Sequence, residues 1–546
     1  MKNYQSQIIG IFLLIAQFAQ AQTVSTGMKV YQIFQQKCVS CHKNSNPQAG
    51  LNLEGAGATV QAKAADVYAK IFQKNPTNPY ALAKGYKQIY AGRPDKSFLF
   101  RKINSGLEPT IQLDAQEGGS MPNNYPANLL TNEEKELVRQ WILYGAPSAG
   151  TVMNDSLITD FYNNGGIKAF PNGAPAAPDA SQGFQLKMGP FFIPKGGEIE
   201  YYTKHELNLP ANLEVNRIEI IISNYSHHFI IYNFTGNGAA SIPAGLRVDA
   251  NHSNIGLVAA VQEATDLKLP QGTAFKWEST RVLDLNSHYI NYSQTKTYQA
   301  EAYVNVYTQP VGTAQQEMYS TLVPNLSINI PNNGNMITAN ANYVSSFLGQ
   351  IYLWGLMGHT HKYGKSYQIF KREANGTAGE MLYNASCGQG IPGCISPLYD
   401  YKHIPLRYFE PFYPINMAQG FVHRASWVND GPTSVSFGPT SADEMMVMIA
   451  MFTRGLVNGN QEVEGALKDI KLYPNPVTDV AVFELPTESG NLEFSLYDAT
   501  GRLLQHQSST EPDIFRLNTS SLAQGIYFYQ FMSEKGERKS GKMMVE

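Results

Sequence analysis

The run Cys38-Val-Ser-Cys41-His42 is the feature that most restricts how this chain folds. Its spacing places two thiols on one turn, where they can add to the two vinyl groups of a haem, with an imidazole beside them to bind the iron. A redox dithiol or half of a zinc site would use similar thiols. The chain has only 4 cysteines and no second pair with this spacing. We therefore expect one covalently attached c-type haem, held by Cys38, Cys41 and His42.

The second axial ligand of this haem has to come from the same domain. Met121, in the tight loop 118–122, offers a thioether and is our candidate. Met28 is the alternative, but it lies close to Cys38 in the sequence and reaches the opposite haem face less easily. An ordinary core or surface role for Met121 also stays open. Ligation by methionine and histidine raises the haem potential and suits transfer of single electrons rather than oxygen binding.

A helix closes this domain. Thr131 and Glu134 have the spacing of a capping box, and the helix that follows ends at residues 145–147. One apolar stripe runs along it, made of Val138, Trp141 and Ile142. With its Cys-x-x-Cys-His start, Met-Pro loop and final Trp-Ile-x-x-Gly-Ala-Pro, the segment 23–148 resembles the small cytochrome c modules that are fused to other exported domains.

The N-terminal residues predict export. Lys2 precedes an apolar run over residues 8–16, and Ala19-Gln20-Ala21 is a small-x-small cleavage site, so residues 1–21 form a predicted signal peptide. The run is too short for a membrane span, which needs about 20 residues, and no comparable run follows it. We expect no transmembrane span in the mature chain.

Length and composition limit the remaining choices. A chain of 546 residues needs several domains, and 43% apolar with 16% charged residues is typical of β-rich exported proteins. A net charge of -3 argues against a nucleic-acid partner. In an oxidising compartment, we expect Cys387 and Cys394 to form a local disulfide.

The C-terminal residues 467–546 predict a small β-sandwich. Apolar residues alternate as in strands over residues 480–485, 492–497 and 526–531. The words Leu-Tyr-Pro-Asn-Pro, Tyr-Asp-Ala-Thr-Gly-Arg and Leu-Ala-Gln-Gly-Ile-Tyr occur in that order, before a basic end. This order resembles the type A sorting domain of the type nine secretion system. The resemblance implies passage through the periplasm, contact with the secretion machinery, and a final place in the medium or on the cell surface.

Three groups of histidines stand out in the middle of the chain, each near the end of a predicted strand: His227 and His228, then His288, then His359 and His361. Residues two apart on a strand point to one face, so the last two could share a metal ion. Neighbours point to opposite faces, so the first two could share a metal only at a bulge or at the strand's end. Either pair alone is weak support for a metal site.

The full ligand set suits copper. Imidazoles bind it in either oxidation state, and Met445, in Asp443-Glu444-Met445-Met446, offers a thioether that is soft enough for Cu(I). Met446 is an alternative ligand that only spacing disfavours. Zinc would explain the histidines, but not the thioether or a neighbouring electron carrier. A blue-copper site needs a cysteine ligand with closely spaced histidine and methionine, which Cys387 and Cys394 lack.

Adjacent histidines, His-Tyr-x-Asn, His-Thr-His-x-x-Gly and Asp-Glu-Met, in this order, resemble the type II copper, ascorbate-dependent monooxygenases. Peptidylglycine- and dopamine-hydroxylating enzymes define that family. The resemblance implies two jelly-roll-like β-sandwiches, at 183–305 and 306–455, after a linker at 149–182. It also implies one copper in each sandwich: an electron-transferring copper on His227, His228 and His288, and an oxygen-activating copper on His359, His361 and Met445.

Two positions depart from the peptide-amidating members. Their Arg two residues before His-Thr-His and their Tyr four after the ligand methionine hold a peptide carboxylate, and Met357 and Ile449 stand there in this chain. A glycine-extended peptide is therefore not the expected substrate. The disulfides of the animal enzymes are also largely absent.

The expected fold class is thus multidomain and mainly β, with a small α-helical cytochrome c domain. The expected function is a secreted copper monooxygenase that hydroxylates a small organic substrate with O2, while an external donor reduces its haem. The linker at 165–180 is rich in Gly, Pro and Ala and would let the haem domain swing onto the copper unit. The alternatives are a non-enzymatic haem and copper electron relay and a zinc hydrolase. We expect the remaining histidines of the middle region to be ordinary polar residues: His205, His252, His403 and His423. A role in a substrate pocket is the alternative for His423.

Overall fold

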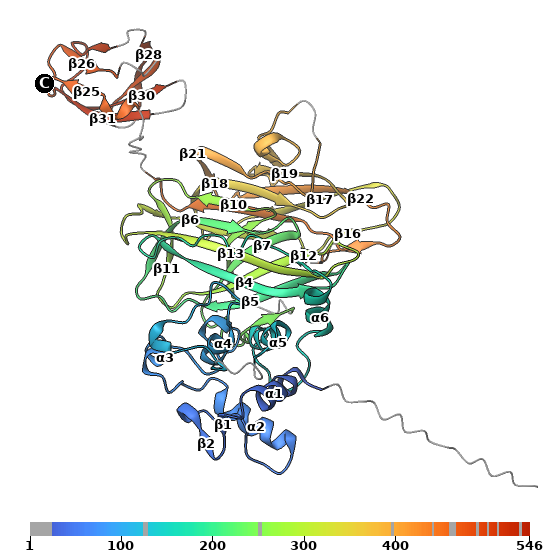
Figure 1. Cartoon of the computed structure of the whole chain (residues 1–546). Coiled ribbons are helices and arrows are strands. Elements are labelled where there is room, and N and C mark those ends of the chain that lie inside the picture. The colour runs from blue at the N-terminus through green and yellow to red at the C-terminus, as the bar shows by residue number, and fades with distance from the viewer. Residues whose placement is uncertain are drawn as a thin grey trace, which may run out of the picture. The chain divides into compact units, whose positions relative to one another are not determined.

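The computed structural model describes residues 24–123, 129–248, 254–394, 398–438, 440, 442–457, 466–486, 491–499, 502–509, 513–533 and 538–546. The predicted signal peptide lies outside these residues. The molecule is a mainly β multidomain protein with several antiparallel sheets and a small N-terminal helical region (Figure 1), so the expected fold class is confirmed at this level. It has two compact units: residues 1–268, 275–310 and 319–452 form one, and residues 269–274, 311–318 and 453–546 form the other.

The helical region covers residues 26–163. Its helices are α1 (Thr26–Lys37), α2 (Val60–Ile71), α3 (Pro79–Ala83), α4 (Phe98–Ile103), α5 (Asn132–Leu143) and α6 (Ser156–Asn163). The apolar faces of α1, α2, α4 and α5 share one core, in which Phe34, Phe100 and Trp141 are buried. The short strands β1 (His42–Lys43) and β2 (Asn46–Pro47) follow the Cys-x-x-Cys-His run. Among the described residues, no helix has both the length and the apolar character needed to cross a membrane.

The predicted helix start at Thr131 is confirmed. The Thr131 side chain accepts a hydrogen bond from the Glu134 N–H, and the Glu134 carboxylate accepts one from the Thr131 N–H. The predicted stripe is also confirmed, since Val138, Trp141 and Ile142 are all buried. The chain leaves α5 through Gly145, whose φ of +91° favours glycine.

The first sandwich packs two sheets against each other. One contains β3 (Ile167–Lys168), β4 (Gly183–Ile193), β6 (Leu213–Ile221), β10 (Thr265–Lys268), β11 (Thr273–Trp277) and β13 (Tyr298–Gln309). The facing strands are β5 (Glu198–Glu206), β7 (Ser226–Phe234), β8 (Leu246–Arg247), β9 (Ile255–Val261) and β12 (Val282–Ile290). Phe191 of β4 and Tyr289 of β12 meet between the sheets, with ring centroids 5.4 Å apart and both side chains fully buried.

The second sandwich repeats this plan. One sheet contains β15 (Tyr319–Pro324), β18 (Gln350–His359), β21 (Arg407–Asn416) and β24 (Val447–Thr453). The facing sheet contains β17 (Met336–Tyr343), β19 (Gly364–Arg372), β20 (Ala378–Asn384) and β22 (Phe421–Val428). The short strands β16 (Asn329–Ile330) and β23 (Val435–Ser436) form a separate two-stranded sheet. Leu353, Tyr367 and Trp427 are fully buried in the core between the sheets.

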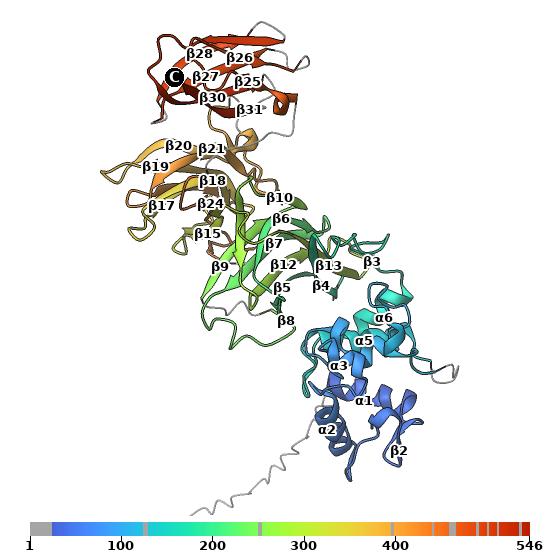
Figure 2. The same cartoon turned by 90° about the vertical axis from the view of Figure 1, so that its left-hand side faces the viewer.

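The two sandwiches share one continuous sheet, with the strand order β21-β18-β24-β15-β9-β7-β12-β5-β8. The join is the antiparallel contact of β9 with β15, where Leu257 pairs with Ser320. Figure 2 shows the strands of the two halves side by side. All five candidate histidines lie on this shared sheet or in the turn that follows β18.

The predicted swinging linker is wrong in one respect, because the segment is bound rather than free. Ile167 and Lys168 of β3 pair with β13, and the Phe170 ring packs against Tyr303 with centroids 5.2 Å apart. The Ala176 carbonyl accepts a hydrogen bond from Asn305 at 3.0 Å. Composition indicated flexibility, but the N–H groups of Ile167 and Ala169 donate to the carbonyls of Thr297 and Gln299 and fasten the start of the segment to the sheet.

Polar contacts join the helical region to the first sandwich. The Lys187 ammonium on β4 lies 2.6 Å from the Glu108 carboxylate, which also accepts a bond from Arg139 at 3.2 Å. The Gln140 amide donates to the Pro190 carbonyl at 2.7 Å. Buried charged contacts have strict geometry, because an unpaired buried charge is costly. These contacts therefore define how α5 meets β4.

The tail forms its own small sandwich, and its predicted strands are confirmed. Its strands are β25 (Lys471–Tyr473), β26 (Val480–Glu484), β27 (Leu492–Tyr497), β28 (Leu503–Ser509), β29 (Ile514–Asn518), β30 (Gly525–Ser533) and β31 (Arg538–Val545). One sheet is β25-β26-β29 and the other is β28-β27-β30-β31. Phe483 from the first sheet and Phe494 from the second meet in the core, with centroids 5.6 Å apart.

Candidate metal centre

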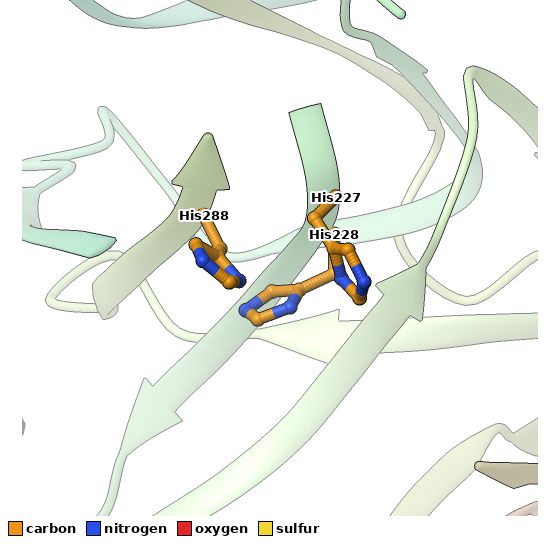
Figure 3. A group of neighbouring side chains, drawn as sticks. All are labelled: His227, His228 and His288. Carbon is orange, nitrogen blue, oxygen red and sulfur yellow. The ribbon is translucent and has the colours of Figure 1, made fainter. Parts of the chain in front are cut away.

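His227, His228 and His288, which we call the His triad, come together on two neighbouring strands (Figure 3). His228 lies opposite His288, whereas Ser226 lies opposite Tyr289, so the register shifts and His227 is the extra residue of a β-bulge. The bulge removes the alternation that would send neighbouring side chains to opposite faces. Ligand atoms of all three imidazoles lie within 4.8 Å of one another, a spacing that suits one metal ion.

Polar side chains orient two rings of the triad. His228 Nε2 lies 3.2 Å from Glu200 Oε1 and 3.1 Å from Asn286 Oδ1, and His288 Nε2 lies 2.7 Å from Glu198 Oε1. Because these oxygens only accept, each Nε2 carries the proton and each Nδ1 keeps its lone pair. Such outer partners fix the tautomer and orientation of metal-binding histidines.

The ring nitrogens left over fit a metal ion. Among the described residues, buried Nδ1 of His227 and buried Nδ1 of His288 have no hydrogen-bond partner. Burial, together with the neighbouring imidazoles, lowers the pKa of His227 to about 3 and also lowers that of His288. Neutral imidazole is the form that binds metals, so burial favours the metal-binding form of His227 and His288.

His359 and His361, which we call the His pair, lie at the end of β18. His359 is the last residue of the strand. We had expected His361 on the strand as well, but it lies in the turn that follows. Their ring centroids are 5.2 Å apart. His361 Nδ1 donates to the Asp443 carbonyl at 3.1 Å, and its buried Nε2 has no partner among the described residues. Burial lowers the pKa of His361 to about 4.

Glu444 fastens this turn to the segment before β24. Its buried carboxylate accepts the N–H of His361 at 2.9 Å, the N–H of Tyr363 at 2.7 Å and Nε1 of Trp427 at 3.0 Å. The sequence pattern contained Glu444 in its Asp-Glu-Met motif, but we assigned it no role. Glu198, Glu200 and Asn286 were missed too, because no local motif marks them.

Met445 and Met446 point to opposite sides. Met446 is fully buried in the core of the second sandwich, where Asn325 Nδ2 lies 3.4 Å from its sulfur. Met445 is partly buried in a separate cluster that contains Met357 and Ile449. Met357 and His359 lie two apart on β18 and so share a face. This arrangement favours Met445 over Met446 as the thioether beside the His pair.

The triad and the pair meet. The rings of His227 and His361 stand edge to face, with centroids 6.0 Å apart. Both rings line a cavity of about 610 Å³. Its wall combines apolar residues with polar and charged ones, and the polar and charged residues include Asn224, Gln262, Tyr401, Lys362, Lys402 and Glu263. The cavity gives a small molecule access to both groups of histidines.

The Cys-x-x-Cys-His run forms a compact turn after α1. The N–H groups of Cys41 and His42 donate to the Cys38 carbonyl. His42 Nδ1 donates to the Leu51 carbonyl at 3.1 Å, which leaves Nε2 as a possible iron ligand. Met121 lies on a loop, and its own N–H donates to the Lys102 carbonyl at 2.7 Å. Its side chain is 36% exposed. Met28 packs against the helical core. Ligation by Met121 stays a prediction.

The predicted disulfide between Cys387 and Cys394 is present. The other histidines fit ordinary polar roles where they are described. His423 is buried, with Nδ1 2.6 Å from the Tyr367 hydroxyl, and His403 pairs with Asp400 on the surface. His205 is buried near the helical region, and His252 lies outside the described residues.

One family accounts for the tail. The sequence family described as the secretion system C-terminal sorting domain matches residues 471–546. The tail is a secretion sorting domain. The protein is therefore secreted or attached to the cell surface, and its sorting domain engages the secretion machinery.

Other comparisons are uninformative about the histidine-bearing part. No curated protein matches the chain. Among solved structures, the β-glucuronidase of Ruminococcus gnavus is 9% identical over 38% of this chain and 35% of the enzyme, with a TM-score of 0.12. The β-1,2-glucanase of Parabacteroides distasonis is 10% identical over 42% and 36%, at 0.14, and PNGF-II is 11% identical over 52% and 69%, at 0.21. The chain thus spans about a third of the first two enzymes, and these TM-scores are too low to indicate a shared fold.

Proposed function

We propose that this protein is an exported copper monooxygenase that hydroxylates a C–H bond of a small organic substrate with O2. Its own c-type haem, on Cys38, Cys41 and His42, would supply the electrons. One observation carries the proposal: imidazoles from two sandwiches converge on one cavity, with buried ring nitrogens that have no partner among the described residues. Met445 follows Glu444, which binds the backbone N–H of His361, and packs in one cluster with Met357 of β18.

The two groups differ in their proposed roles. His227, His228 and His288 would hold a copper that stores an electron. His359, His361 and Met445 would hold the copper at which oxygen reacts, because a softer and less charged ligand set favours Cu(I). Bound copper supplies the one-electron steps and the reduction of O2. The fold expected for such a unit is two jelly-roll-like sandwiches, as the two-layered halves suggest.

The chain's own residues hold and orient the ligands. Glu198, Glu200 and Asn286 keep the protons of two triad rings on Nε2. The Asp443 carbonyl holds the proton of His361 on Nδ1, and Glu444 fixes the turn that carries His361. Each turnover would take one O2, two electrons and two protons, and would yield one alcohol and one water. The haem gives one electron at a time, so an external donor has to reduce it twice.

The cavity between the groups would bind the substrate. Met357 and Ile449, which replace the carboxylate-binding residues of the peptide-amidating enzymes, are both buried in an apolar cluster. They offer no polar group to a peptide carboxylate. The substrate class is therefore a small molecule other than a glycine-extended peptide.

The test measures reoxidation of the reduced haem by air in the purified mature protein, with copper loaded or removed. We expect copper to accelerate reoxidation, and Met445→Leu to abolish the acceleration. Met446→Leu is the matched control, because it makes the same change at the adjacent residue, which faces the core. A rate that copper does not change would overturn the proposal.

A non-enzymatic electron relay is the second candidate. The edge contact between His227 and His361 favours it, because electron exchange between the groups needs no substrate. A relay would keep copper-dependent haem oxidation by an added electron acceptor in Met445→Leu, and would release no hydroxylated product in a substrate screen. A zinc hydrolase would act equally well with oxidised and reduced haem.

A further inference from the structure

A pair of tyrosines joins the helical region to the strand beside the His triad. Tyr144 caps the C-terminal end of α5, and Tyr201 lies on β5. Their hydroxyl oxygens are 2.6 Å apart, and their rings stand edge to face with centroids 5.7 Å apart. Tyr144 is three residues after Trp141, which packs in the same core as Cys38. The two regions thus touch through aromatic rings.

Buried rings continue from this contact to the triad. Tyr201 packs against Phe191, with centroids 4.7 Å apart, and Phe191 packs against Tyr289 at 5.4 Å. Tyr289 follows His288 directly in β12. Phe191 and Tyr289 are fully buried, and Tyr201 is 9% exposed. The ring contacts therefore form an unbroken series of buried aromatic side chains from Tyr201 to the strand that carries His288.

A second, shorter branch leaves Tyr201 through its backbone. Asn286 Nδ2 donates to the Tyr201 carbonyl at 3.3 Å, and Asn286 Oδ1 lies 3.1 Å from His228 Nε2. This branch reaches the triad through covalent bonds and two hydrogen bonds. Both branches begin at the contact between Tyr144 and Tyr201, so an electron on either branch passes through that contact.

We infer that Tyr144, Tyr201 and Phe191 form the path by which electrons pass from the haem to the His triad. The inference rests on the proposed function, which requires a reduced haem and copper on the triad. In each passage one electron leaves the ferrous haem, which becomes ferric, and reduces copper(II) to copper(I). No bond forms or breaks and no proton moves. An external one-electron donor then reduces the haem again.

The bound linker supports a fixed path. Because β3 pairs with β13 and Lys187 bonds to Glu108, the helical region is held against the first sandwich through contacts of its own. The electron therefore does not depend on a swinging haem domain. Tyr144, Tyr201 and Phe191 act as positioning residues, since none of them is a ligand.

The experiment reduces the haem with a light flash in the full-length, haem- and copper-loaded protein without oxygen, and follows the haem spectrum as the electron leaves. We expect Tyr201→Leu, which removes the contact shared by both branches, to slow the transfer severalfold, and Phe191→Leu, which interrupts only the ring branch, to slow it by a smaller factor. Phe192→Leu is the matched control: Phe192 is the adjacent buried residue, but its ring packs on Phe161 of α6, away from the triad. The Phe192→Leu variant should transfer the electron at the wild-type rate.

Two further readouts separate a lost path from a changed driving force. The haem potential and the copper signal in electron paramagnetic resonance should be the same in all variants. If the leucine variants do not fold, Tyr144→Phe keeps the ring and removes only the hydroxyl contact, and should still slow the transfer.

Three outcomes would overturn the inference. Unchanged rates in Tyr201→Leu and Phe191→Leu would overturn the path and leave the proposed function standing. Equal slowing in Phe191→Leu and Phe192→Leu would show a general loosening of the interface instead of a path. No transfer in the wild-type protein would overturn the proposed haem-to-copper function itself.

Discussion

The His triad and the His pair lie 6.0 Å apart at their nearest rings, yet they are held in different ways. The triad rings are oriented by carboxylates, Glu198 and Glu200, which sit on a neighbouring strand. The pair is oriented by a backbone carbonyl and by an amide side chain, and it lies where a strand gives way to a turn. Carboxylates therefore contact the ring nitrogens of two triad histidines, whereas neutral groups contact the ring nitrogens of the pair, and the nearby Glu444 carboxylate binds the backbone N–H of His361 instead.

This difference agrees with the roles that we propose for the two groups. Nearby carboxylates stabilise a metal ion of higher charge, so copper on the triad would favour the oxidised state and have the lower potential. Neutral partners and a thioether would favour Cu(I) on the pair. Electrons would then move downhill from the triad to the pair, in the direction that the proposed function requires.

The largest effect is expected when the Glu444 carboxylate, which fixes the turn that carries His361, is removed. Glu444→Ala leaves four N–H donors without their acceptor, and each unpaired buried donor costs about 1–3 kcal/mol. We expect the free energy of unfolding to fall by at least about 3 kcal/mol. Guanidinium unfolding followed by tryptophan fluorescence measures it, because Trp427 contacts the replaced group.

Asp443→Ala is the control for that change, since the Asp443 side chain bonds to exposed Thr440 and not to the histidine turn. It should cost about 1 kcal/mol or less. Equal losses in the two variants would mean that Glu444 does not organise the turn.

Metal loading separates the two groups next. Copper(II) at a free concentration of 100 times its Kd should raise the free energy of unfolding by about 2.7 kcal/mol. The rise should vanish in His288→Ala and persist in Met445→Leu. Silver(I) is a redox-inert substitute for Cu(I) and prefers the thioether. The rise that it causes should vanish in Met445→Leu and persist in His288→Ala. Thermal unfolding measures both, with the exposed residue change His403→Ala as the control.

The carboxylates of the triad give a smaller effect. Glu200→Gln should lower the affinity of the triad for copper(II) by about 10- to 100-fold, the usual effect of losing an outer partner of a metal-binding histidine. Affinity for Cu(I) should change less, so the potential should rise by about 59 mV for each tenfold difference. Chelator competition and redox titration measure these changes. Glu206→Ala, on the same strand but away from the rings, should have no effect on either.

Much of the fold follows from local sequence patterns. The capping box of Thr131 and Glu134 and the alternating strands of the tail depend on residues a few positions apart, so a sequence contains the whole signal. A metal shared by the neighbours His227 and His228 required either a bulge or the end of the strand, and the register shift beside His288 is a bulge.

Other parts depend on contacts that no local pattern records. Glu200 and Asn286 are 86 residues apart and meet only because β5 and β12 pair in one register. The join of β9 to β15 and the edge contact of His227 with His361 depend on how two sandwiches associate. The linker at 165–180 was misjudged for the same reason, since its composition cannot show that β13 offers it a free edge.

The smallest effect is expected when Gln262 is replaced, a residue that connects the first sandwich to His359 of the second. Its amide nitrogen lies 3.2 Å from His359 Nδ1 and 3.2 Å from the Tyr401 carbonyl, while its buried Oε1 has no partner among the described residues. The amide nitrogen thus holds the His359 ring in one orientation at the end of β18. Gln262→Ala should therefore weaken Cu(I) binding to the pair by about 0.5–1.5 kcal/mol, the usual net value of one hydrogen bond.

The adjacent change Glu263→Ala is the control, because Glu263 lines the same cavity. Chelator competition for Cu(I) measures both variants, and copper(II) binding to the triad should be unchanged in each. If Gln262→Ala weakened the triad as much as the pair, the two groups would be a single coupled site, and the contrast between charged and neutral partners would not separate their functions.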